Sequence, residues 1–356
     1  MMNVKQNELK ELMEIDCPII QGPFGGGISS IELLAIVSNL GGLGSFGAHY
    51  LAPERIIALI HDIRKETERS FNINLWVSNF DEDGRHLEQQ KYEALCEDFK
   101  PYYDELSIAL PVFPNDLYHS FEEQAEAIIE ARPKVFSFVY GVPSTDIIER
   151  CKERGIITLG TATTLNEAIA LEDGGVDAVV VTGFEAGGHR VSFLKEAEDS
   201  LTGTLALIPQ VVDRIKIPII TAGGIADARG IRAASELGAS GVQVGTAFLA
   251  CDESGTSMTH REALFAEAAR ETILSRAYTG RLARFIPDKF IQDMANHDDL
   301  PSPFPIQSFF VKALKEEALK TGNMDYLPMY SSQSAPLLKH RKAKTLFEDL
   351  AMAFQN

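Results

Sequence analysis

Short apolar segments alternate with amphipathic segments through the first 250 residues, and this alternation limits the fold more than any other feature of the chain. Strands that alternate with helices form parallel sheets. Eight strand–helix units in roughly 250 residues are typical of a (β/α)8, or TIM, barrel, and an open doubly wound sheet is the alternative. The segments expected to be strands cover residues 18–21, 42–46, 71–77, 135–139, 156–159, 178–181, 218–221 and 241–244.

The strand rhythm stops near residue 251, and the rest of the chain predicts two further parts. Residues 252–323 have a helical and loop-like pattern, interrupted by the proline-rich Pro301–Pro305, and we expect a small helical lid domain over the barrel mouth. Residues 324–356 are expected to return to the barrel through a helix at 342–354, so the barrel domain consists of 1–251 and 324–356. Within the barrel, helices are predicted near 29–40, 121–131, 144–154, 165–173 and 227–237, and another is expected to begin near 52–54. The charged stretch 81–100 is expected to be a loop plus a helix.

The chain is strongly acidic, with 33 Lys plus Arg against 51 Asp plus Glu and a formal net charge of -18. Such a chain repels phosphate backbones, so we expect no nucleic-acid partner. No apolar run reaches the roughly 18–20 residues of a membrane helix. The N-terminus is too charged for a signal peptide, and four scattered cysteines suit a reducing compartment. We therefore expect a cytoplasmic monomer or homodimer with no membrane contact and no metal site.

Glycine is concentrated directly after the first, sixth, seventh and eighth predicted strands. In a barrel the active site lies at these carboxyl ends of the strands. Glycine lets main-chain N–H groups approach an anion, because no Cβ stands in the way. The loops after strands seven and eight form the usual phosphate site of such barrels. Gly223, Gly224, Gly245 and Thr246 fit that role, and the alternative is that these residues only make tight turns.

A further glycine pattern, Gly42–Gly47, matches the G-x-G-x-x-G fingerprint of dinucleotide-binding proteins. That fingerprint needs a strand before it and a helix that starts inside it. Here a helix precedes the glycines, and the glycines lie within a strand. We therefore predict no dinucleotide-binding fold of the Rossmann type.

Two polar residues are candidates for contact with a ligand. His189 follows Gly187 and Gly188 after the sixth strand, where a histidine is more often an acid, a base or an anion partner than a structural residue. The other seven histidines have charged or helical surroundings and are expected to be solvated. Asn74 lies inside the apolar third strand, and its buried amide needs a hydrogen bond. The partner is either a flavin or nucleobase edge or the backbone of a neighbouring strand.

Three charged residues lie close to His189 in the sequence. Glu185 is expected to have a structural role, either to orient the glycine loop or to pair with a backbone N–H. Arg190 and Lys195 are interpreted as surface charges.

Four motifs together resemble the nitronate monooxygenase family, whose members were formerly called 2-nitropropane dioxygenases. The motifs are Pro18–Gly27, Ser38–Gly44, Gly183–His189 and Gly241–Phe248, and Met329–Ser334 is similar to a loop that the family places near its flavin. The resemblance implies a barrel that holds FMN non-covalently under a helical lid, with His189 as the catalytic histidine. The residues then expected to bind FMN are Gln21, Gly22, Pro23, Phe24, Gly25, Asn74, Thr182, Gly187, Gly188, Gly223, Gly224, Gln243, Val244, Gly245, Thr246 and Gln333.

The resemblance also implies a reaction that starts from an alkyl nitronate such as propionate 3-nitronate. The second substrate is O2, and the products are a carbonyl compound and nitrite. His189 would take the α-proton of a nitroalkane or place a positive charge beside a bound nitronate. Thr182 stands where many members have Gln, and Phe24 stands where Met is common, so both positions bear on the choice of substrate.

Two other functions stay open at this point. FMN-dependent enoyl-ACP reductases share the barrel and the Glu-x-Gly-Gly-His loop, so an NAD(P)H-dependent reductase of an enoyl thioester or a quinone is the first of them. A non-catalytic barrel that binds a flavin or a phosphate is the second. The sequence has no obvious basic patch for an acyl-carrier protein or a 2′-phosphate, which favours nitronate oxidation.

Overall fold

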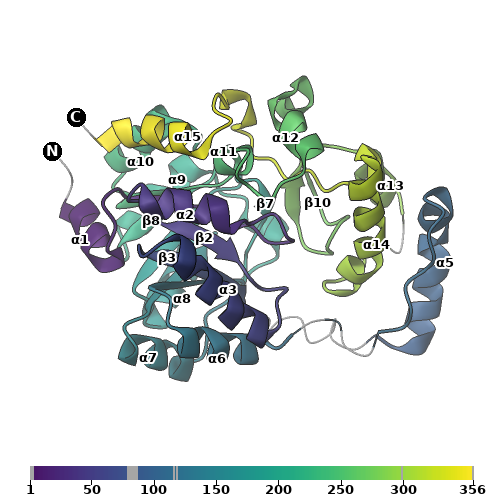
Figure 1. The fold of residues 1–356 in the computed structure, drawn as a ribbon, viewed down its shortest axis with the longest axis horizontal. Helices are drawn as coiled ribbons and strands as arrows, with labels where there is room; N and C mark the ends of the chain where they lie inside the picture. Colours follow the sequence, from purple (N-terminus) through teal and green to yellow (C-terminus); the bar gives the residue numbers. More distant parts are fainter. Residues whose placement is uncertain (1–3, 78–86, 115–116, 118, 298–299, 355–356) are drawn as a thin grey trace.

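Eight parallel strands form a closed barrel in the computed structural model of the chain (Figure 1). The structure describes residues 4–77, 87–114, 117, 119–297 and 300–354. The strand order is β1-β9-β8-β6-β5-β4-β3-β2. The first and last strands of this order meet, because Leu43 pairs with Ile20 and its carbonyl accepts a 2.9 Å bond from the N–H of Gln21. The barrel prediction is confirmed, and the open sheet is excluded. The strands are β1 (Ile19–Gln21), β2 (Gly44–Gly47), β3 (Phe71–Trp76), β4 (Val135–Val139), β5 (Ile157–Ala162), β6 (Ala178–Thr182), β8 (Ile219–Ala222) and β9 (Gly241–Val244).

The helix α1 (Val4–Met13), which the sequence analysis did not predict, closes the amino-terminal end of the barrel. Its Leu9 and Met13 are fully buried and pack with strand residues such as Ile20, Leu159 and Val180. Because this end is filled by side chains, a ligand has access from the opposite, carboxyl-terminal end of the strands.

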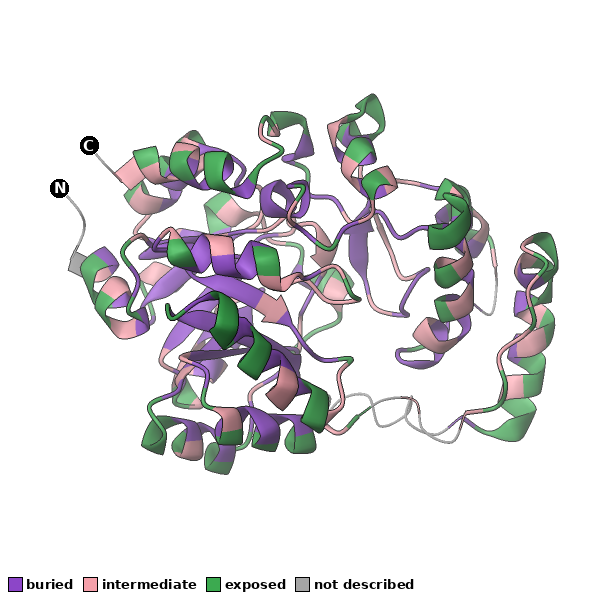
Figure 2. Cartoon of the chain, in the orientation of Figure 1, coloured by how far each residue is buried: buried purple, intermediate pink, exposed green. Residues whose placement is uncertain are grey.

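The predicted helices around the barrel lie close to their expected positions, because local capping signals mark where they begin. Two further helices, at Thr204–Val212 and Thr246–Leu249, were not predicted. The side chains of Ser30, Ser144 and Thr164 each accept a bond from a backbone N–H of the first turn. Figure 2 shows that these helices, apart from the fully buried one at Thr246–Leu249, expose their outer faces while the strands are buried. No helix in the described part of the chain is long and apolar enough to cross a membrane. The helices are α2 (Ile31–Asn39), α3 (Pro53–Glu66), α6 (Phe121–Ala131), α7 (Thr145–Glu153), α8 (Leu165–Asp173), α9 (Thr204–Val212), α10 (Ala228–Glu236), α11 (Thr246–Leu249) and α15 (Ala343–Ala351).

The segment expected to be a helical lid contains helices and also two short strands. The helices are α12 (Met258–Phe265), α13 (Lys289–Ala295) and α14 (Ile306–Thr321). The strands β10 (Ile273–Ser275) and β11 (Ala283–Phe285) join β7 (Gly188–His189) in a separate antiparallel sheet, in the order β10-β11-β7. These strands show no rhythm in the sequence, because each is very short and β11 pairs with the distant β7 as well as with its neighbour β10. Short 3-10 turns lie at Ala197–Ser200, Glu267–Arg270, Met324–Tyr326, Ala335–Leu337 and Met352–Phe354.

The helix α5 (Gln89–Glu105) lies beside α14, away from the barrel (Figure 1). Its Phe99 stacks on Phe310 with ring centroids 4.9 Å apart, and the hydroxyl of Tyr103 donates a 2.6 Å bond to the carbonyl of Phe310. A helix that precedes residue 251 therefore shares a core with the lid segment. The start of the charged stretch in which this helix was expected, residues 81–86, lies outside the described residues.

Candidate active site

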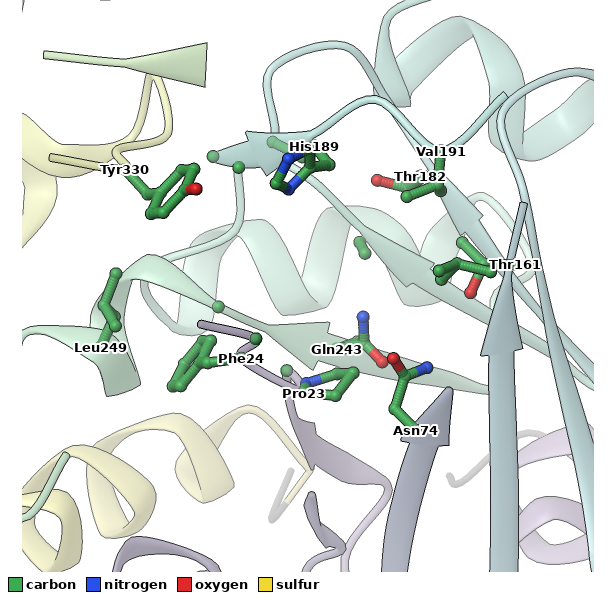
Figure 3. A pocket seen from close by; sticks show the side chains of 18 of the residues that line it. Pro23, Phe24, Asn74, Thr161, Thr182, His189, Val191, Gln243, Leu249 and Tyr330 are labelled. Carbon is green, nitrogen blue, oxygen red and sulfur yellow. The ribbon is translucent and has the colours of Figure 1, made fainter. Parts of the chain in front are cut away.

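A cavity lies at the carboxyl-terminal end of the barrel strands. It has a volume of about 200 Å³ and continues past Gly223, Gly224 and Ile225 into a more open hollow of about 320 Å³. Figure 3 shows His189 and Tyr330 on one side of the cavity and Pro23, Gln243 and Asn74 on the other. The structure thus brings together predicted residues from five barrel strands, β1, β3, β6, β8 and β9, and from the loops that follow them. The predicted site residues that line the first cavity are Gly22, Pro23, Phe24, Gly25, Asn74, Thr182, Gly187, Gly188, His189, Gly223, Gly224, Gln243, Gly245 and Thr246.

Three predicted residues lie elsewhere. Val244 is fully buried in the core, because side chains alternate along a strand and its neighbours Gln243 and Gly245 take the cavity side. The side chain of Gln21 is turned away and accepts a 2.8 Å bond from the N–H of Ser45. Gln333 lines the second hollow rather than the first.

One wall of the cavity consists of Gly223, Gly224, Gly245 and Thr246, and we call it the glycine wall. Gly223 and Gly224 have φ values of 97° and 73°, a region that favours glycine. A Cβ placed on Gly245 would meet nothing within 4 Å, so this backbone faces open space. A Cβ placed on the nearby Gly187, in contrast, would lie 2.6 Å from the backbone nitrogen of Ser332. The glycine wall therefore offers bare backbone to a ligand at Gly245.

The charge on the glycine wall comes from backbone dipoles. Among the described residues that line the two hollows there is no Lys or Arg, and Glu185 is the only carboxylate. That carboxylate accepts bonds of 2.9 and 3.0 Å from the N–H of Thr204 and one of 2.9 Å from its hydroxyl. Glu185 thus orients its loop, as expected. An anion at this wall would be held by neutral N–H groups.

Asn74 is buried, yet it lines the cavity. Its amide nitrogen donates a 2.9 Å bond to the hydroxyl of Ser137 on β4, which also accepts a 2.8 Å bond from Asn72. The expected alternative, a bond to a neighbouring strand, is therefore present, although the acceptor is a side chain. The carbonyl oxygen of the Asn74 amide has no partner among the described residues and is available to a ligand.

His189 lies on β7, where it pairs with Ala283 of β11. Its Nε2 atom is 2.9 Å from the Oγ1 atom of Thr279. Burial lowers the pKa of His189 to about 3, with a further contribution from the positive charge of Arg281. The imidazole is therefore neutral at pH 7. A neutral ring accepts or shares a proton, and it supplies no standing positive charge.

An aromatic wall faces the same cavity and is formed by His49, Tyr50, Trp76, His189 and Tyr330. The sequence analysis singled out His189 but did not predict the wall around it. The ring of His49 stacks on Trp76 at 3.8 Å and 8°, and His189 meets Trp76 edge-on at 5.0 Å. Neither ring nitrogen of His49 has a hydrogen-bond partner among the described residues. One signal was available, since His49 and Trp76 both lie close to the carboxyl ends of predicted strands.

Three assignments of exposure made from the sequence are wrong. His49 is 7% exposed and His260 3% exposed, although both were expected to be solvated. The Nε2 atom of His260 is 2.9 Å from the carbonyl of Tyr330, which ties α12 to the cavity edge. Arg190 was interpreted as a surface charge but is 5% exposed. Its guanidinium donates to the carbonyls of Thr163, Thr182 and Ser200, and carbonyls brought together only by the fold give no sequence signal.

Comparison with known proteins places this geometry in a family. The profile of the family described as nitronate monooxygenase matches residues 6–352. A probable nitronate monooxygenase of Staphylococcus saprophyticus is 39% identical over 341 residues, which are 95% of each chain. A second one, from Staphylococcus haemolyticus, is 36% identical over 97% of this chain and 96% of its own.

Solved structures agree with this result. The nitroalkane oxidase of Streptomyces ansochromogenes superposes with a TM-score of 0.88 at 31% identity, and 97% of each chain is covered. FabK of Thermotoga maritima superposes with a TM-score of 0.75 at 26% identity, over 98% of this chain and 96% of that one. The chain therefore belongs to the nitronate monooxygenase family of flavin-dependent enzymes.

Proposed function

We propose that this enzyme oxidises small alkyl nitronates, such as propionate 3-nitronate, with O2 and with FMN as its cofactor. The products would be a carbonyl compound and nitrite. The observation that carries the proposal is a neutral His189 that lines the same cavity as the bare backbone of Gly245. A proton-accepting group thus stands in one cavity with a wall suited to a phosphate.

The described residues fit FMN at two points. The glycine wall leaves open space at Gly245, where a phosphate can approach backbone N–H groups. The unpartnered amide oxygen of Asn74 suits an N–H group at the edge of a flavin ring. FMN would supply the redox chemistry, while the protein supplies binding, orientation and electrostatics. The single glycine wall, without a dinucleotide fingerprint, supports FMN over FAD.

The protonation state of His189 supports nitronates over neutral nitroalkanes as the better substrates. A base with a pKa of about 3 removes a carbon-bound proton slowly at pH 7, because its driving force is small. A preformed nitronate needs no such step.

The second candidate function is an NAD(P)H-dependent reductase, favoured by the likeness to FabK. The described residues that line the cavity include no Lys or Arg for the 2′-phosphate of NADPH, so such a reductase would be expected to use NADH.

Anaerobic mixing tests the proposal. The purified enzyme is mixed with propionate 3-nitronate, NADH and NADPH in parallel, and flavin absorbance is followed. Rapid bleaching by the nitronate alone is expected, and bleaching by NAD(P)H alone would establish the reductase instead. Heat release of the cofactor followed by chromatography should yield FMN, and recovery of FAD would contradict the cofactor assignment.

A further inference from the structure

The hydrogen bonds around Thr279 specify which nitrogen of His189 carries the proton. Thr279 is 5% exposed and follows β10 in the lid segment, 90 residues away from His189 in the sequence. A hydroxyl group has one proton to donate and two lone pairs that accept. All three of these positions are occupied around the Oγ1 atom of Thr279.

Two of the three partners have fixed roles. The backbone N–H of Arg281 can only donate, and its nitrogen lies 3.3 Å from Oγ1. The carbonyl of Arg281 can only accept, and its oxygen also lies 3.3 Å from Oγ1, so we assign the hydroxyl proton to this carbonyl. One lone pair of Oγ1 remains, and the Nε2 atom of His189 faces it at 2.9 Å.

We infer that Thr279 is a positioning residue that holds the proton of neutral His189 on Nε2 and leaves Nδ1 as the basic nitrogen. The Nδ1 atom has no hydrogen-bond partner among the described residues, and His189 lines the cavity. The position of the proton does not depend on the proposed function, but the role of Nδ1 as a base in catalysis rests on it. The α-proton of a nitroalkane would move to Nδ1, and the electron pair of the C–H bond would form the C=N bond of the nitronate. The imidazole would then carry two protons, and nothing is oxidised in this step.

The turn that carries Thr279 is built to hold this geometry. Gly280 has a φ of 79°, and a Cβ at this position would lie 2.2 Å from the carbonyl oxygen of Ser302. The N–H of Gly280 donates a 2.8 Å bond to the carbonyl of Arg276, whose guanidinium returns a 3.0 Å bond to the carbonyl of Gly280. Pairing of β7 with β11 fixes the other partner, His189, against the same segment. The lid segment therefore sets the proton position of a residue on a barrel loop.

The test reads the proton position directly, without a substrate. The enzyme as isolated is labelled with 15N-histidine, and His189 is assigned from the signal lost in His189→Asn. At pH 7 the wild-type spectrum should show a protonated Nε2 and an unprotonated Nδ1. Thr279→Ser should keep this pattern, whereas Thr279→Val should lose or reverse it. A wild-type His189 protonated on Nδ1 would overturn the inference, whether or not the valine variant folds.

Kinetics supply the second measurement. In Thr279→Val, kcat for a neutral nitroalkane should fall by about 10- to 100-fold, the same order as the loss of a partner that orients a metal-binding histidine. Turnover of a nitronate should stay close to wild type, and Thr279→Ser should restore the nitroalkane rate. Ser275→Ala is the matched control. It removes a hydroxyl from the same segment, but this hydroxyl accepts a bond from the N–H of Ala277 rather than from His189.

Failure of the proposed function and failure of the inference give different results. An enzyme that turns over neither substrate contradicts nitronate oxidation, while its spectrum still decides the position of the proton. Equal loss of both activities in Thr279→Val, with an unchanged spectrum, would show that Thr279 only supports the fold.

Discussion

The glycine wall and the aromatic wall enclose the same cavity but are built in opposite ways. The glycine wall is a short-range structure, in which Gly223, Gly224, Gly245 and Thr246 directly follow β8 and β9. The aromatic wall collects side chains from β3, β7, the loop after β2 and a late segment that contains Tyr330. The first wall offers backbone to a ligand, and the second offers groups that titrate. We therefore predict that binding of the cofactor and proton transfer are separable, and four changes test this separation.

The largest effect is expected at the aromatic wall, in His189→Asn. Loss of the proton acceptor should lower kcat for a neutral nitroalkane by about 10²–10⁴-fold, the usual contribution of a positioned base. Turnover of a nitronate should fall less, because no C–H bond is broken by the protein. FMN content should stay intact, since the glycine wall is unchanged. Wild-type rates on both substrates with full flavin would mean that His189 is structural.

At the boundary of the two walls, Asn74→Leu should weaken FMN binding about 5- to 150-fold, because one ligand hydrogen bond worth about 1–3 kcal/mol is left unmade. Asn72→Leu is the matched control. Both amides donate to the hydroxyl of Ser137, but Asn72 does not line the cavity. The control should lose thermal stability and keep its FMN affinity in a fluorescence titration. Equal FMN affinities in the two variants would assign Asn74 to the fold alone.

Acidification should act on the aromatic wall. Burial lowers the pKa of His49 well below 6.5, so the unfolded chain binds a proton that the folded protein does not. The free energy of unfolding therefore falls as the pH drops below about 6.5, by at most about 1.4 kcal/mol per pH unit for this group. In urea unfolding between pH 6.5 and 5, the free energy of unfolding should depend less steeply on pH in His49→Gln than in the wild type. The control His61→Gln, at an exposed histidine, should have the same pH dependence as the wild type. The wild-type pH dependence in His49→Gln would contradict the assignment.

The smallest effect is expected at the glycine wall, in Gly245→Ala. The added methyl group enters open space, so the melting temperature should stay near wild type. FMN affinity should fall about 2- to 12-fold, because a phosphate can no longer approach one backbone N–H. Gly187→Ala is the contrasting variant, in which the methyl group meets the backbone of Ser332 and lowers stability. A loss of stability in Gly245→Ala without a loss of affinity would remove the glycine wall from the binding site.

Much of the barrel was predictable, because its signals are local. The apolar runs, the capping residues Ser30, Ser144 and Thr164, and the glycines after the strands all lie within a few residues of the structure they specify. The site residues on the cavity wall could also be predicted, because in a barrel the carboxyl ends of all strands converge at one end. Their role in FMN binding stays a prediction that the variants above test.

The features that the sequence did not reveal depend on residues that are far apart along the chain. His189 contacts Thr279 and pairs with β11. The guanidinium of Arg190 is buried and donates hydrogen bonds to three carbonyls, and α5 packs in the core of the lid segment. In each case the type of residue was ordinary, and its environment came from packing. The glycine wall was therefore determined by the sequence alone, because backbone conformation depends mainly on neighbouring residues. The protonation state of the aromatic wall follows from burial and from distant hydrogen-bond partners, which exist only after the chain has folded.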